Sequence, residues 1–283
     1  MIDETVEEIA EMQTHSSSVV AIKAAQALRA LSDREFPAVE EYQRALERNS
    51  DALRRANPSH ATLQTTQREI VDRVAQSGAD TVADAKARTE GAISDVVERV
   101  ESAKARAGER AAESLSDGDT VFTYDYSSTV LEALERAAVG GVSLTIYCAE
   151  ARPRHLGRKM ARTLAEIDEF DVHLVVDAAA GIFLSECDCV MVGMDCIVDD
   201  TLYNRVGTYP VAATAANVGV PVVVVGAESK IVGGGFAFEN EERSVSEVIR
   251  EPADGFAVEN PAYDATPMRL VDRVVTDAGV REY

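Results

Sequence analysis

Apolar residues in the first part of the chain recur at the spacing of an α-helix. The clearest run is Val19, Val20, Ile22, Ala25, Leu28 and Leu31. Ser16, Ser17 and Ser18 precede it and can cap a helix there. A later run ends before Asn57-Pro58, because the residue before a proline avoids the helical conformation. Nothing before Ser116 alternates like a strand, so we predict a helical domain over residues 1–115.

The pattern changes after Ser116-Asp117-Gly118-Asp119, which is typical of a turn. Short apolar runs then alternate with helical stretches. The expected strands are Thr120–Tyr124, Val142–Cys148, Val172–Val176, Cys189–Val192, Pro221–Val225 and Val271–Thr276. Alternation of strand and helix at this spacing predicts a parallel sheet with right-handed crossovers. The expected fold class is therefore α/β, with the N-terminal helical domain followed by a Rossmann-like parallel sheet domain over residues 116–283.

Acidic residues greatly outnumber basic ones, with 49 Asp and Glu against 28 Lys and Arg and a formal charge of −21. This balance argues against direct nucleic-acid binding and against a membrane partner, because attraction to phosphates supplies most non-specific affinity. The apolar runs are far shorter than the about 20 residues that cross a bilayer, and the acidic start Met1-Ile2-Asp3-Glu4 lacks the apolar core of an export signal. We expect a cytoplasmic protein. The scarcity of Lys beside so many acidic residues favours a high-salt cytoplasm over an ordinary acidic protein.

The candidates for thiol chemistry are Cys148, Cys187, Cys189 and Cys196. No His stands at metal-ligand spacing from Cys187-Asp188-Cys189. We interpret all four as small buried apolar residues rather than a metal site. The chain also lacks the phosphate loop G-x-x-x-x-G-K-[ST] and the dinucleotide fingerprint G-x-G-x-x-G. We therefore expect neither a metal nor another cofactor.

Ligands of a parallel sheet bind at the carboxyl ends of its strands, so the residues after each expected strand are candidates for a site. The densest basic patch follows the second strand. It comprises Arg152, Arg154, His155, Arg158, Lys159 and Arg162. Guanidinium groups and the free N–H groups at the start of a helix bind anions, so a phosphate or phosphosugar is the expected ligand. The alternative is a solvated helix face that balances acidic residues elsewhere.

Other candidates follow the later strands. Asp177 and Asp195 can act as general bases or hold a sugar hydroxyl, or they can cap the helices that follow. Asn204-Arg205, shortly before a helix, suits a second phosphate, although this signal alone is weak. Lys230 can pair with a phosphate, or it can be an ordinary exposed lysine.

Three segments resemble the motifs of one known family. They are Glu150-Ala151-Arg152-Pro153 with Gly157, Val192-Gly193-Met194-Asp195 followed by Asn204-Arg205-Val206-Gly207-Thr208, and Asn260-Pro261 to Asp264-Ala265-Thr266-Pro267. By its residues alone, the last segment is a rigid double turn. The family joins the alpha, beta and delta subunits of translation initiation factor 2B to the ribose-1,5-bisphosphate and methylthioribose-1-phosphate isomerases. The resemblance covers nearly the whole chain. It implies the family's fold and pairing through the α/β domain, as a homodimer or as a hetero-oligomer with other family members.

The departures from the family's motifs bear on activity. Where the resemblance places the cysteine of the isomerases, this chain has Asp125, followed by Tyr126-Ser127 as in the initiation-factor subunits. Where it places a phosphate-binding loop, the chain has His15-Ser16-Ser17-Ser18, and a later Arg-Pro pair of the family reads Asn57-Pro58. The family's general acid/base position is kept as Asp195. Also kept are Asn204 and Lys230, while Arg205 stands where a Lys is usual.

The missing thiol and two missing arginines argue against isomerase chemistry, because a carboxylate replaces a thiol as a proton carrier only if its pKa is retuned. We therefore predict a non-catalytic, regulatory homologue of the initiation factor 2B subunits. It would bind a phosphorylated small molecule, either a sugar phosphate or a nucleoside monophosphate. The expected ligand-binding residues are Arg152, Arg158, Asp177, Asn204, Arg205, Lys230, Ser127 and Ser17. The alternative is a sugar-phosphate aldose–ketose isomerase, similar to ribose-1,5-bisphosphate isomerase, that uses Asp125 and Asp195 as its proton-transfer pair.

Overall fold

The computed structural model describes residues 2–11, 17–58, 60–233, 236, 238–251 and 254–283. The chain forms two compact units. One comprises Met1–Ser102 with Ala237–Glu239, and the other comprises Ala103–Phe236 with Asn240–Tyr283. The boundary falls inside a long helix, whereas the sequence pattern placed it at residue 115.

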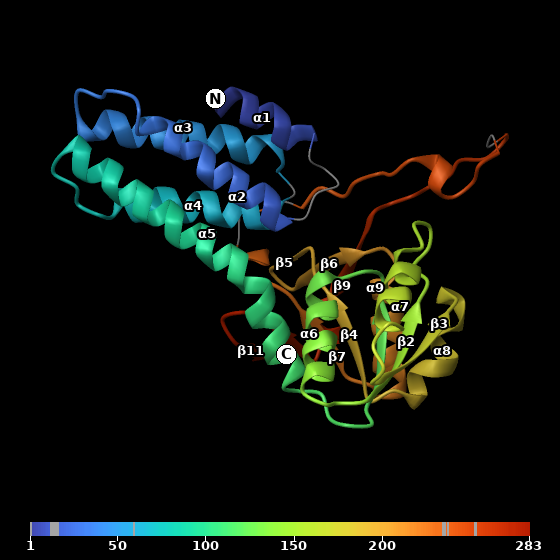
Figure 1. The fold of residues 1–283 in the computed structure, drawn as a ribbon. Helices are drawn as coiled ribbons and strands as arrows, with labels where there is room; N and C mark the ends of the chain where they lie inside the picture. The colour runs from blue at the N-terminus through green and yellow to red at the C-terminus, as the bar shows by residue number, and fades with distance from the viewer. Residues whose placement is uncertain (1, 12–16, 59, 234–235, 237, 252–253) are drawn as a thin grey trace. The chain divides into compact units, whose positions relative to one another are not determined.

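The first unit is built of helices (Figure 1). They are α1 (Ile2–Glu11), α2 (Ser17–Ala27), the short η1 (Leu28–Leu31), α3 (Val39–Ala56), α4 (Ala61–Ala75) and the first part of α5 (Val82–Ala112). Their apolar faces form one core, in which Leu28, Leu46 and Ile70 are fully buried. The expected helical half is confirmed, and α3 ends directly before Asn57-Pro58. Of the serines expected to cap α2, Ser17 is its first residue, and Ser16 lies outside the described residues.

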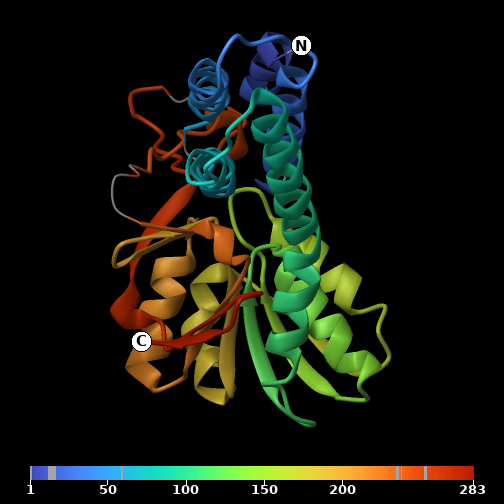
Figure 2. The same cartoon turned by 90° about the vertical axis from the view of Figure 1, so that its left-hand side faces the viewer.

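The second unit contains a seven-stranded sheet in the order β11-β10-β7-β4-β1-β2-β3. Its strands are β1 (Thr120–Tyr124), β2 (Leu144–Ala149), β3 (Phe170–Val175), β4 (Cys189–Gly193), β7 (Val222–Val225), β10 (Arg273–Val275) and β11 (Val280–Glu282). All pairs are parallel except β10 with β11, a strand that the sequence pattern missed (Figure 2). This order confirms the expected α/β fold class. It also makes β1 and β4 the neighbours at which the strand order reverses, which is where open α/β sheets bind ligands.

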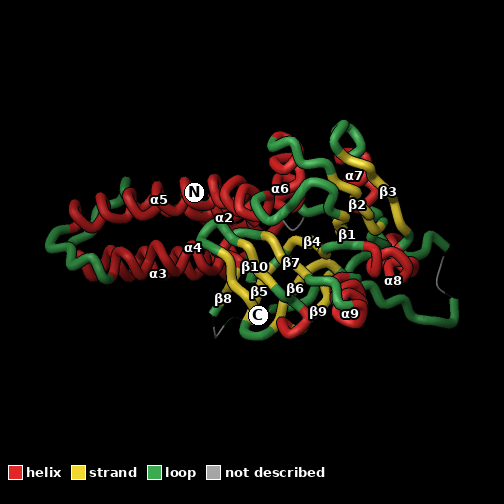
Figure 3. The backbone as a smooth tube through the Cα atoms, turned by 90° about the horizontal axis from the view of Figure 1, so that it is seen from below, coloured by secondary structure: helices red, strands yellow, loops and turns green. Residues whose placement is uncertain are grey.

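Helices cover both faces of this sheet (Figure 3). On one face lie α6 (Ser128–Val139), α7 (Leu156–Leu164) and the end of α5 after Ser102, packed on Val121, Met191 and Val223. On the other lie α8 (Ala180–Phe183) and α9 (Thr208–Val218), packed on the alternate strand residues Phe122 and Val224. Because both faces are buried, β7 reads as an unbroken run of four valines.

A second, four-stranded sheet was not expected from the sequence. It has the order β8-β5-β6-β9 and consists of β5 (Cys196–Val198), β6 (Thr201–Arg205), β8 (Ile231–Val232) and β9 (Tyr263–Pro267). The interpretation of residues 260–267 as a rigid double turn is therefore wrong for the second half of this segment, which forms a strand antiparallel to β6. Its polar and proline residues hide the strand pattern, and only pairing with distant β6 makes it extended.

The start of α9 is held by a carboxylate from β9. Asp264 Oδ2 accepts hydrogen bonds from the N–H groups of Gly207, at 2.6 Å, and Tyr209, at 2.9 Å. Gly207 precedes the helix and has no side chain that could cap it. Asp264 thus satisfies backbone donors that every helix start leaves unpaired.

We expect Asp264→Ala to lower the free energy of unfolding by about 1–2 kcal/mol, the usual cost of removing a helix cap. Urea unfolding followed by circular dichroism measures this loss. Asp168→Ala is the matched control, because Asp168 is exposed and forms none of these bonds. Equal unfolding midpoints for the two variants would contradict the capping role.

Candidate functional site

Two carboxylates lie at the point where the sheet reverses its strand order. Asp125 directly follows β1, and Asp195 lies two residues after β4. Asp125 is buried, with 7% of its surface exposed, and has a left-handed backbone with φ of 63°. A residue other than glycine in this conformation carries a conformational cost, although Asp tolerates it better than most. Such strained conformations are typical of functional positions, where the backbone orients a side chain toward a ligand.

Arg205 lies between the two carboxylates. It is the last residue of β6, and its Nε is 3.8 Å from Asp125 Oδ2 and 3.6 Å from Asp195 Oδ2. Its guanidinium also stacks over the Tyr263 ring, with 4.9 Å between Cζ and the ring centroid. Both carboxylate distances exceed those of direct hydrogen bonds. Each carboxylate therefore keeps acceptor capacity for a ligand.

Burial raises the pKa of Asp125 from 3.8 to about 6, and the nearby Arg205 guanidinium limits this rise. A buried carboxylate is disfavoured because it loses the hydration of its charge. The result is a carboxyl group that changes protonation near neutral pH. Such a group can take up and release a proton under physiological conditions.

Lys230 follows β7 and turns inward rather than into solvent. Its Nζ donates a hydrogen bond to the Met194 carbonyl oxygen at 2.7 Å. Burial lowers its pKa, and the charge of Asp195 opposes this shift. The interpretation of Lys230 as an exposed surface lysine is therefore wrong. The ammonium group lies beside Asp195, and its pairing with a phosphate stays a prediction.

Several expected ligand residues have partners within the protein. Asp177 accepts hydrogen bonds from the N–H groups of Ala151, at 2.8 Å, and Arg152, at 2.7 Å. It therefore holds the loop after β2 and does not cap the helix that follows, and its contact with a sugar hydroxyl stays a prediction. Arg158 donates to Glu150 Oε2 at 2.6 Å, which leaves less of its charge for a ligand.

Two further candidates support the local backbone. Asn204 is buried and donates from Nδ2 to Thr208 Oγ1 at 3.0 Å, which joins the end of β6 to the start of α9. Ser127 caps α6 by accepting a hydrogen bond from the Val130 N–H. Ser17 belongs to the helical unit and not to the unit that holds the carboxylates, and its neighbours His15 and Ser16 lie outside the described residues.

A small pocket of about 20 Å³ lies against Asp125 and Arg205. It is also lined by Tyr124, Arg152 and Arg154. Arg154 belongs to the basic patch but was not predicted to bind the ligand. The stacking role of Tyr263 was also missed, although its place in the third family motif was a signal that could have pointed to it.

The cysteines do not form a reactive centre. Burial raises the pKa of all four thiols to about 12, so they stay protonated. Cys187 follows the short helix η3 (Leu184–Glu186), and Cys189 begins β4, where the expected strand Cys189–Val192 also begins. Among the residues that the structure describes, no group of three or more His, Cys, Asp or Glu side chains could hold a metal ion. None of the described helices is long and apolar enough to span a bilayer.

Comparisons with known proteins place the geometry in a wider context. The model of the initiation factor 2 subunit family matches residues 13–282. The ribose 1,5-bisphosphate isomerase of Haloterrigena turkmenica is 33% identical, over 97% of this chain and 88% of that protein. The enzyme of the same name from Haloferax volcanii is 31% identical, over 97% of this chain and 87% of that protein. The tetrameric eIF2B-beta2-delta2 complex of C. thermophilum contains a chain with a TM-score of 0.77 and 18% identity, matched over 99% of this chain and 90% of that one, which shows the fold.

Proposed function

The chain belongs to the initiation factor 2 subunit family, and from this premise we propose that it is an aldose–ketose isomerase acting on a phosphorylated sugar. The observation that carries the proposal is the pair Asp125 and Asp195 on either side of Arg205, with the pKa of Asp125 raised to about 6 by burial. The names of the relatives from Haloterrigena turkmenica and Haloferax volcanii favour ribose 1,5-bisphosphate as the substrate.

The proposed reaction moves a hydrogen from C2 of the sugar to C1 as a proton. Asp125 takes the proton from C2 and returns it to C1. Asp195 gives a proton to the ring oxygen as the ring opens and takes one from the C2 hydroxyl as the carbonyl forms. Both carboxyl groups end in the state in which they began, and no oxidant or reductant is consumed. Arg205 stabilises the negative charge that develops on the sugar oxygens between these steps.

The raised pKa of Asp125 weakens the argument that the missing thiol excludes catalysis. A free thiol has a pKa of about 8.5 and a free aspartate about 3.9, so an ordinary carboxylate is a much weaker base. Burial brings Asp125 to about 6, part of the way toward a thiol. A base with a pKa near the operating pH transfers protons efficiently. This retuning favours the isomerase over the regulatory role that the sequence suggested first.

A non-catalytic, metabolite-binding protein is the second candidate. It is favoured by the internal partners of Asn204 and Lys230, because two groups that the family resemblance assigned to the ligand already have hydrogen bonds. Such a protein would bind a sugar phosphate through Arg152 and Arg205 without converting it.

The two candidates are separated by incubating the protein with ribose 1,5-bisphosphate and with methylthioribose 1-phosphate. Proton NMR of the products in D₂O reports both turnover and solvent exchange at C1. We expect Asp195→Asn to lower turnover at least about 100-fold, the usual contribution of a general acid or base. Asp168→Asn, on an exposed carboxylate, serves as the control. Absence of turnover of either sugar by the wild-type chain would favour the second candidate.

We further propose that the chain works in a high-salt cytoplasm as a homodimer or with other family members. The acidic surface charge and the oligomeric relative from C. thermophilum support this assembly. Light scattering at high KCl tests it, and a mass near 30.4 kDa would contradict it.

A further inference from the structure

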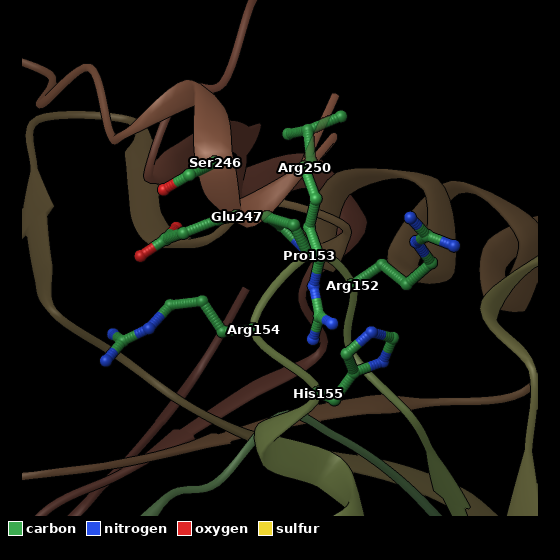
Figure 4. A pocket seen from close by; sticks show the side chains of 8 residues that line it. Arg152, Pro153, Arg154, His155, Ser246, Glu247 and Arg250 are labelled. Carbon is green, nitrogen blue, oxygen red and sulfur yellow. The ribbon is translucent and has the colours of Figure 1, made fainter. Parts of the chain in front are cut away.

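A second, larger hollow opens on the α/β unit beside the small pocket. Its volume is about 460 Å³. One wall is the loop of residues 152–155, between β2 and α7, and the other is formed by residues 246–248 and Arg250, around and after η5 (Val245–Glu247). In Figure 4 the Arg250 side chain extends between Arg152 and Arg154 toward His155. Two segments distant in sequence thus bring basic side chains to one hollow.

The hollow is lined by more basic than acidic side chains. No carboxylate of a described residue lies within ion-pair distance of Arg152, Arg154 or Arg250. Glu247 lines the hollow as well, but its carboxylate is bound by Arg243, with Nε at 3.0 Å from Oε2 and Nη2 at 3.1 Å from Oε1. In a chain with a formal charge of −21, carboxylates are abundant, so three unpaired arginines around one hollow indicate an external anion.

We propose that this hollow binds a phosphate monoester group. Guanidinium groups bind phosphate oxygens through two parallel hydrogen bonds, and their affinity for a dianion exceeds that for a single negative charge. The volume lies within the range of small-molecule sites, about 300–1,000 Å³, and leaves room for part of a sugar beside the phosphate.

The hollow and the small pocket of the candidate site share part of their lining. Arg152, Pro153 and Arg154 line both of them. A single ligand can therefore place its reacting carbons near Asp125 and a distal phosphate in the hollow. This role rests on the proposed function and narrows the substrate class to sugars with two phosphates. The anion could also be a separate phosphate compound, and the experiment distinguishes these sources.

The test is equilibrium binding by isothermal titration calorimetry. The probes are ribitol 1,5-bisphosphate, ribitol 5-phosphate and inorganic phosphate; the two ribitol phosphates have no anomeric carbon and cannot isomerise. Arg250→Gln removes one unpaired guanidinium and Arg250→Glu reverses its charge. Arg269→Gln is the control, because Arg269 is exposed and does not line the hollow.

We expect Arg250→Gln to weaken ribitol 1,5-bisphosphate binding about tenfold and Arg250→Glu to weaken it further, since one charged hydrogen bond contributes about a factor of ten or more. Weaker binding of ribitol 5-phosphate in the same variants would place the C5 phosphate of a bisphosphate, the one distant from the reacting carbons, in the hollow. The other result is that wild type saturated with ribitol 5-phosphate still binds inorganic phosphate and that the Arg250 variants lose this binding. It would identify the anion as a separate phosphate compound and would still support the hollow as a phosphate site.

Binding of every probe by Arg250→Glu as tightly as by Arg269→Gln would overturn the inference. This result differs from a failure of the proposed function. If the chain turns over no sugar but its bisphosphate affinity depends on Arg250, the isomerase proposal fails and the phosphate site stands.

Discussion

Asp125→Asn is expected to lower isomerase turnover by about 10²–10⁴-fold, because the amide cannot accept the proton from C2. In the wild-type chain, Asp125 acts as a base only when it is ionised. Turnover should therefore rise as the pH increases through about 6. A pH profile of kcat between pH 4.5 and 8.5 measures this dependence. A flat profile in this range would contradict the role of Asp125 as the base.

The same substitution is expected to stabilise the protein above pH 6. Between pH 4 and 6 the folded chain holds a proton on Asp125 that the unfolded chain has released, so stability falls as the pH rises through this window. Above it, the buried charge costs up to about 3 kcal/mol, the equivalent of a shift of about two pKa units. Asparagine removes this charge and tolerates the left-handed backbone of position 125.

Urea unfolding at pH 4 and pH 7.5 measures the effect. The gain in free energy of unfolding should be present at pH 7.5 and absent at pH 4. Asp125→Cys is the informative companion, because it replaces the carboxylate by the thiol that the family resemblance expects. It should retain turnover with a pH dependence displaced toward higher pH. Equal stability of wild type and Asp125→Asn at both pH values would mean that burial of this carboxylate is not costly.

Gly157→Ala is expected to destabilise the α/β unit by about 3 kcal/mol or more, at the upper end of the cost of overpacking. A Cβ atom at position 157 would lie 1.7 Å from the Ala149 carbonyl oxygen. That oxygen belongs to β2, which is paired with β1 and β3 on both sides, so the strand cannot move aside. Gly157 therefore allows α7 to begin against the strand end and holds the loop of Arg152 and Arg154 at the site.

Urea unfolding and the yield of folded protein measure this effect. Gly181→Ala is the control in the same unit, since a Cβ there would make only an ordinary contact of 3.7 Å with Thr214. It should leave the unfolding midpoint nearly unchanged. A Gly157→Ala protein as stable as Gly181→Ala would show that α7 does not need this close approach.

Much of the fold followed from local patterns. Helical spacing through Leu28 and the run of Val222–Val225 each indicated the correct element, because side chains on a buried face must be apolar whatever their partners. The second sheet did not follow, since the strand Tyr263–Pro267 is polar and becomes extended only by pairing with Thr201–Arg205. Three family motifs indicated the family, and the match over residues 13–282 confirms it.

The candidate site likewise has features that the sequence predicted and features that appear only in the folded chain. The sequence by itself determined that Asp125 and Asp195 each follow a strand and that basic residues gather after β2, because the order of elements sets which residues reach the carboxyl ends of the sheet. Only the tertiary structure decided that Arg205 lies between the carboxylates, that Asp177 is occupied by backbone N–H groups, and that Arg250 joins the loop of Arg152. Burial and ion pairing depend on residues far apart in the chain, so the pKa of Asp125 and the charge of the hollow arise only once the chain has folded.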